Sequence, residues 1–114
     1  MDFLFVIWEG EGAATSEERR QEATNLMAAY VFDLLDQGKL KGGAPLFPAS
    51  QAVTVRATEG KVTVADGPYI ETKDAIGGYF VVEADSMEEA TEWAQACPAA
   101  RYGGVEIRGI MPMV

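Results

Sequence analysis

The fold is decided by the stretch ADGPYIETKDAIGGYFVVEAD, residues 65–85, which joins a turn, a charged patch and an apolar strand. Asp-Gly-Pro at 66–68 is turn chemistry, because Asp bonds its own following backbone, Gly accepts a positive φ and Pro blocks strand pairing. The Gly-Gly pair at 77–78 then introduces an apolar run, 79–84, which predicts a strand. We interpret the whole stretch as the chain's entry into a central strand of a sheet.

Apolar periodicity predicts two further elements before this stretch. Residues 3–8 are apolar on both alternating faces, which is typical of a strand buried on both sides. Residues 16–37 predict a helix, because apolar side chains recur there at i, i+3 and i+4. Thr15 and Glu18 form a possible capping box, and Gly38 occupies the position of a helix C-terminal glycine.

The middle of the chain predicts an edge strand and a hairpin. The Gly- and Pro-rich segment 38–50 has room for one short edge strand, around Leu40 or at 44–47, because prolines are excluded from central strands. Residues 53–64 alternate cleanly and turn near 59–60, which predicts a β-hairpin. One face of this hairpin is expected to be apolar, and the other face is wet and carries Thr54, Arg56 and Thr63.

A helix and a strand are predicted after the opening stretch. Ser86 and Glu89 form a second capping box, and an apolar helical stripe runs from there to Cys97 before Pro98 ends the helix. Residues 105–110 alternate in polarity, as expected of an edge strand.

The order β-α-β-hairpin-β-α-β predicts one α+β domain over residues 1–114, with a ferredoxin-like split βαβ pattern and an inserted β-hairpin. The first and third strands of that pattern are central. Two helices cover only one sheet face, although the other face of the central strands still carries large apolar residues. Exposed patches of that size are uncommon in monomers, so we expect a homodimer whose second copy covers this face.

Composition excludes several classes of function. The net charge of −9 argues against nucleic-acid binding, which needs a basic patch. No membrane span or signal peptide is expected, so a cytoplasmic protein is the default expectation. The chain has no histidine, which removes Ser-His-Asp and Cys-His catalysis and His-ligated metals. No metal site and no cofactor are expected, and Cys97 on the apolar stripe is interpreted as a buried thiol.

The chain resembles a known family over residues 64–110, VADGPYIETKDAIGGYFVVEADSMEEATEWAQACPAARYGGVEIRGI. The Asp-Gly-Pro-aromatic turn, Glu-Thr-Lys, Gly-Gly-aromatic, CPAARYG and VEIR follow one another as in the DGPF branch of the YCII-related proteins, with Tyr69 where that branch has Phe. The resemblance implies a dimeric α+β barrel but no assigned reaction. The wider group carries a His-Asp pair suggestive of enzymatic activity, and that chemistry cannot be transferred to a chain without histidine. The resemblance therefore does not assign the Asp role to Asp66, whose proposed partner is missing.

Candidate ligand-binding residues lie in the opening stretch and near the last strand. They are Asp66, Glu71, Thr72, Lys73, Arg101, Glu106 and Arg108. A guanidinium beside the last strand can hold a carboxylate or phosphate bidentately, and a threonine hydroxyl both donates and accepts. Two alternatives stay open. The 66–73 segment is then only a solvated turn, and Arg108 forms a structural ion pair.

Three functions remain compatible with these residues. The first is a non-catalytic dimeric module that binds a small polar or anionic ligand, or a protein partner. The second is a cofactor-free enzyme with Asp66 or Glu106 as base and a Tyr or Lys73 as acid. The third, a regulatory partner of a sigma factor, rests only on the family resemblance, because some members are encoded beside such factors.

Overall fold

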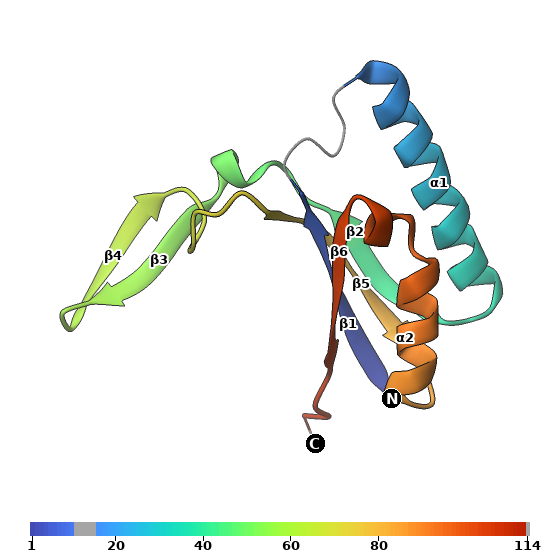
Figure 1. The fold of residues 1–114 in the computed structure, drawn as a ribbon. Helices are drawn as coiled ribbons and strands as arrows, with labels where there is room; N and C mark the ends of the chain where they lie inside the picture. Colours follow the sequence, from blue (N-terminus) through green and yellow to red (C-terminus); the bar gives the residue numbers. More distant parts are fainter. Residues whose placement is uncertain (11–15, 114) are drawn as a thin grey trace.

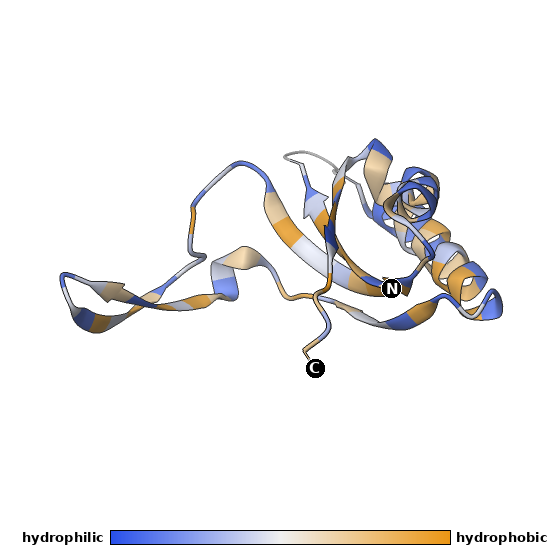
Figure 2. Ribbon diagram, turned by 90° about the horizontal axis from the view of Figure 1, so that it is seen from below, coloured by the Kyte–Doolittle hydropathy of each residue, from blue (hydrophilic) through white to orange (hydrophobic). Residues whose placement is uncertain are grey.

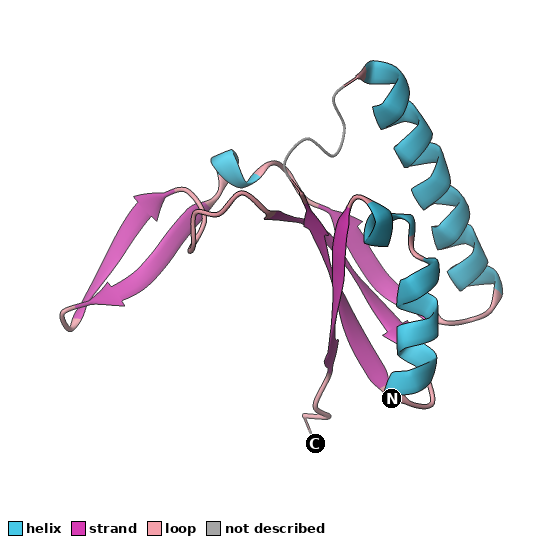
Figure 3. Cartoon of the chain, viewed as in Figure 1, coloured by secondary structure: helices cyan, strands magenta, loops and turns pink. Residues whose placement is uncertain are grey.

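A computed structural model describes residues 1–10 and 16–113 of the chain. Figure 3 shows its helices and strands. In chain order the elements are β1 (Asp2–Glu9), α1 (Glu17–Asp36), β2 (Leu40–Pro45), η1 (Ala49–Gln51), β3 (Val53–Thr58), β4 (Lys61–Asp66), β5 (Ala75–Glu83), α2 (Met87–Ala96), η2 (Pro98–Arg101) and β6 (Gly103–Gly109).

The main sheet has the strand order β2-β5-β1-β6, with every neighbouring pair antiparallel. β1 and β5 are central, and β2 and β6 are the edges, as the split βαβ pattern predicted. β3 and β4 pair only with each other and form a separate two-stranded sheet, inserted between β2 and β5. The α+β fold with an inserted hairpin is therefore confirmed.

Both helices lie on one face of the sheet (Figure 1). Phe3, Phe5 and Val82 point to that face and are almost completely buried, together with Leu34 of α1. Tyr30 joins the two helices, because its hydroxyl donates a 2.6 Å hydrogen bond to the backbone oxygen of Trp93. Burial raises the pKa of Tyr30 well above its usual value, so this hydroxyl keeps its proton.

The start of α1 differs from the predicted capping box. Thr15 lies outside the described residues, and the N-cap is Ser16, whose hydroxyl accepts a 3.2 Å hydrogen bond from the backbone N–H of Arg19. At the other end Gly38 has a φ of +69°, as predicted for a C-terminal glycine. The predicted cap of α2 at Ser86 is confirmed by the bond it accepts from Glu89 N–H.

β5 begins earlier than predicted, because Gly77 and Gly78 lie inside the strand and not before it. A side chain at Gly78 would lie 2.9 Å from the backbone oxygen of Ala44 on β2. The Gly-Gly pair therefore allows the neighbouring strands to approach closely. The β1–β5 register is irregular beside it, between Ile7 and Trp8.

The sheet face away from the helices is bare in the described chain, and we call it the bare face. Leu4, Val6 and Val81 lie on it, since each alternates with residues buried under the helices, and all three are half-buried. Figure 2 shows apolar residues along these strands. Both views place the β3–β4 hairpin on the side of the sheet opposite the helices, extending outward. We call residues 53–66 the arm.

Candidate functional site

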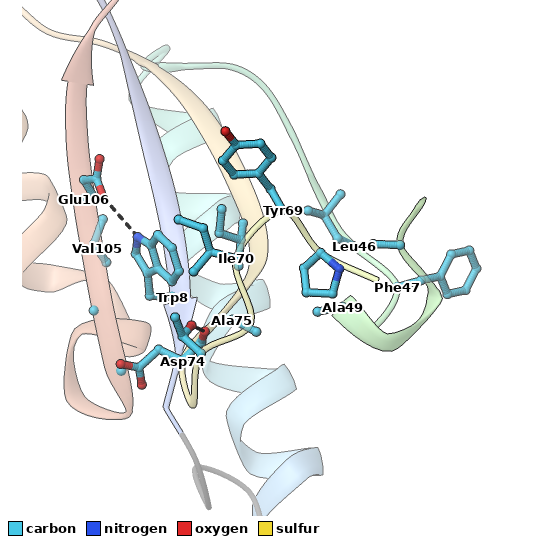
Figure 4. A pocket seen from close by; sticks show the side chains of 16 residues that line it. Trp8, Leu46, Phe47, Ala49, Tyr69, Ile70, Asp74, Ala75, Val105 and Glu106 are labelled. Carbon is cyan, nitrogen blue, oxygen red and sulfur yellow. Dashed lines mark hydrogen bonds between the residues drawn. The ribbon is translucent and has the colours of Figure 1, made fainter. Parts of the chain in front are cut away.

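A groove of about 900 Å³ opens on the bare face, where the sheet meets the base of the arm (Figure 4). Trp8, Ile76 and Glu106 of three neighbouring strands form its floor. Residues of the loop 68–72 and of segment 46–52 form its two walls. The lining is mainly apolar with a few polar groups, which is the usual character of a small-molecule site.

The polar groups of the groove centre on Glu106. Its Oε1 accepts a 3.2 Å hydrogen bond from Nε1 of Trp8, and Nη1 of Arg108 lies 3.7 Å from its Oε2. A carboxylate has about four acceptor sites, so Glu106 retains capacity for a ligand donor. Thr72 and Asp74 also line the groove. The Thr72 hydroxyl donates a hydrogen bond to the backbone oxygen of Asp74.

The Asp-Gly-Pro-Tyr turn is fastened to the polar face of the arm. Gly67 N–H donates to Ala52 O at 2.7 Å, and Thr54 Oγ1 donates to Gly67 O at 2.7 Å. Arg56 donates from Nη2 to Tyr69 O at 2.8 Å, and its guanidinium carbon lies 4.1 Å from the centre of the Tyr69 ring. The turn thus holds one wall of the groove against the arm.

The structure brings three of the predicted site residues together. Thr72 and Glu106 line the groove, and Arg108 is paired with Glu106. These three remain candidates for ligand contact. The ion pair with Glu106 also fits the structural alternative for Arg108. Because the pair is exposed, its contribution to stability is small.

The other predicted site residues lie elsewhere. Asp66, Glu71 and Lys73 are exposed and line neither described cavity, and Arg101 is an exposed residue of η2. In the acid–base hypothesis, Glu106 is therefore in the groove, whereas Asp66 and Lys73 are outside it.

Sequence reasoning missed Ile70 and Asp74 as groove residues. Figure 4 shows Trp8 and Ile70 on one side of the groove and Leu46 and Ala49 on the other. Trp8 was likewise not among the predicted site residues. Its position follows from alternation, because Trp8 shares the bare face with Leu4 and Val6.

A second pocket of about 760 Å³ lies on the helix side of the sheet. Its polar side chains include those of Glu9, Arg20, Thr24 and Tyr102, and none of the predicted site residues lines it. No motif in the sequence indicated this pocket, because its lining residues come from segments that are distant along the chain.

Cys97 is the single cysteine of the chain. Cys97 is buried, and burial raises the pKa of its thiol, which disfavours the nucleophilic thiolate as predicted.

Among residues 1–10 and 16–113 no three Asp, Glu or Cys side chains gather as a metal site would require. No helix in the described part of the chain is long and apolar enough to span a membrane.

The chain belongs to the YCII-related domain family, whose domain matches residues 1–114. It is 30% identical over 102 residues to an uncharacterized protein of Rhizobium meliloti (strain 1021), covering 88% of this chain and 82% of the relative. Its fold is similar to that of 5-chloro-2-hydroxyhydroquinone dehydrochlorinase (TftG) from Burkholderia phenoliruptrix AC1100, solved with 2,5-dihydroxybenzoquinone. That match has a TM-score of 0.57 and 20% identity over 97% of this chain and 94% of TftG. The DGPF branch stays a prediction.

Replacing Gly67 by valine should lower the free energy of unfolding by about 1–2 kcal/mol. Gly67 has a φ of +106°, which a β-branched residue adopts only with strain. Urea unfolding of the variant measures this loss. Gly42→Val is the matched control, since Gly42 is in a strand with open space around it and no positive φ. Equal stability of the two variants would contradict the role of Gly67 in the turn.

Proposed function

We propose that this protein is a homodimeric module that binds a small planar molecule carrying hydroxyl groups in the groove on the bare face. The observation that carries the proposal is the Trp8–Glu106 pair on the groove floor, an aromatic face beside a carboxylate at a hydrogen-bond distance of 3.2 Å. The indole offers stacking area, and the carboxylate accepts from a ligand hydroxyl.

The size of the groove suits such a ligand. Ligand sites usually enclose about 300–1,000 Å³ and place a few polar groups in an apolar lining. The groove has about 900 Å³, with Ile70 and Ile76 among its apolar residues and Thr72 and Glu106 among its polar ones.

The charge of the groove favours a hydrogen-bond donor over an anion. Its charged lining residues are Asp74 and Glu106, both acidic, whereas the cation Arg108 is paired with Glu106. An anionic ligand would meet like charge unless it displaced that ion pair. A neutral hydroxylated ring meets no such repulsion.

The bare face supports the homodimer. Leu4, Val6 and Val81 lie on it beside Tyr79, which is 37% exposed, and no described element covers them. A second copy placed there by a two-fold axis would bury the same side chains from both chains. It would also lie over the groove, because Trp8 belongs to the same face.

Tryptophan fluorescence tests the ligand proposal. Trp93→Phe leaves Trp8 as the sole indole, because the sequence has 2 tryptophans. Resorcinol should then quench Trp8 emission saturably, and benzoate should bind more weakly. TftG, solved with 2,5-dihydroxybenzoquinone, makes oxygenated rings a reasonable first set of probes.

Glu106→Gln should weaken resorcinol binding by about tenfold, because a hydrogen bond to a charged group contributes about 1.5–3 kcal/mol. Arg101→Gln is the control, since Arg101 lines neither cavity. Tighter binding of benzoate than of resorcinol would contradict the preference for a neutral ligand over an anion. Emission unaffected by both compounds would argue for a protein partner in the groove.

A further inference from the structure

We infer that the arm, residues 53–66, is an interaction element whose valine face packs on the second copy and fixes one wall of the ligand groove. The inference rests on the proposed homodimer and names the part of the chain that holds it together. It is carried by the exposed valines of the arm, by the surface area of the chain and by the contacts at the base of the arm.

The two faces of the arm differ in chemistry. Cross-strand pairing places Val55 opposite Val64, and Val53 and Val62 lie on the same face. These four valines are 60–76% exposed. The sequence predicted an apolar face, but in the described chain no other element packs extensively on either strand of the arm. A lone two-stranded hairpin is marginally stable in water, so this face needs a partner surface.

The surface area of the chain matches what a stable dimer buries. The chain exposes 8387 Å², whereas a folded monomer of 12.3 kDa usually exposes about 6,100 Å². The radius of gyration is 15.8 Å, against about 13.3 Å for a compact chain of this length. The excess of about 2,300 Å² on each of two copies would make an interface of about 4,600 Å², within the range of obligate homodimers.

The low charge of the valine face permits a second copy as its occupant. The whole chain has a net charge of −9, so two copies repel each other on average. The arm as a whole is neutral, because Arg56 and Lys61 balance Glu59 and Asp66. Of these side chains Asp66 lies on the valine face, opposite Val53 at the base of the arm, whereas Arg56 and Lys61 lie on the other face. The four valines themselves are uncharged, so packing them on an acidic copy of the same chain adds little to the repulsion.

The arm is held rigidly to the groove wall. Glu59 and Gly60 at its tip have φ values of 51° and 77°, as in the tight turns that match strand twist. At its base Thr54 and Arg56, on the face opposite the valines, bond to Gly67 and Tyr69 of the wall. A second copy that fixes the valine face would thus also fix the wall, because the same strands carry both contacts.

Sedimentation of the full chain over a concentration series tests the inference with two neighbouring substitutions. Val64→Asp places a carboxylate on the valine face, whereas Ala65→Asp places the same group on the opposite face of the same strand. The wild type should sediment as a dimer of the 12.3 kDa chain. Val64→Asp should raise the dissociation constant at least about tenfold, and Ala65→Asp should leave it nearly unchanged. Equal constants for both variants, or a monomeric wild type, would overturn the inference.

Hydrogen exchange of the wild type gives a measurement that depends on no variant. Amide exchange of residues 53–66 should slow as protein concentration rises through the dissociation constant, because the partner protects the arm. Exchange independent of concentration over that range would overturn the inference. Resorcinol quenching stays a separate readout. If the arm results hold and no ligand binds, only the proposed function fails. If ligand binds and Val64→Asp remains dimeric, only the role of the arm fails.

Discussion

Val82→Asp should leave the chain unable to fold. Val82 is completely buried under the helices on the central strand β5, next to Phe3 across the strand pair. An ionised carboxylate there has no partner, since the described core contains no buried polar or charged residue. The expected cost is on the order of 4 kcal/mol or more, a large part of the stability of a small domain.

Circular dichroism and thermal unfolding measure this effect. The expected result is loss of the cooperative transition or a strongly reduced melting temperature. A variant that melts like the wild type would show that Val82 does not face the core.

Val6→Asp, the same substitution on the opposite face of the sheet, should instead separate the proposed homodimer. Val6 lies on the bare face of β1, opposite Tyr79 and Glu106 of the two neighbouring strands. A two-fold interface contains each residue twice, so two uncompensated carboxylates would be buried. The dissociation constant should rise at least about a hundredfold, equivalent to about 3 kcal/mol.

Two measurements assess this second variant: circular dichroism reports whether it folds, and sedimentation reports its mass in solution. Its circular dichroism spectrum should stay native, while its mass in solution should fall to that of one chain. A dimer of unchanged affinity would place the interface elsewhere than on the bare face. Loss of folding in Val6→Asp as in Val82→Asp would contradict the assignment of the two valines to different faces.

Much of the fold could be predicted because its signals are local. A continuous apolar run identified β1, and alternation identified the hairpin. Ser86 and Gly38 marked helix ends, and the order of elements predicted the strand order of the sheet. The start of β5 was misplaced because glycine is also a turn residue, and only the distance to Ala44 on β2 shows that close strand packing requires it here.

The site was predictable only in part, because a groove depends on side chains that are distant in sequence. Thr72 and Glu106 were found from their positions on a loop and on an alternating strand. Trp8 and Glu106 are 98 residues apart, and only strand pairing brings them into contact. Arg56 was predicted on the wet face of the hairpin and is exposed. Its contact with the Tyr69 ring was not predicted, because no local pattern indicates that the loop folds back on the arm.

The burial of Cys97 has a practical consequence for spectroscopy. Because the chain's single cysteine is 1% exposed and its thiol is held protonated, a maleimide or spin label has little access to it. A cysteine introduced for the exposed Lys61, near the tip of the hairpin, would then take the label selectively. Pulsed electron resonance between two such labels would report directly how the tips of two subunits are separated.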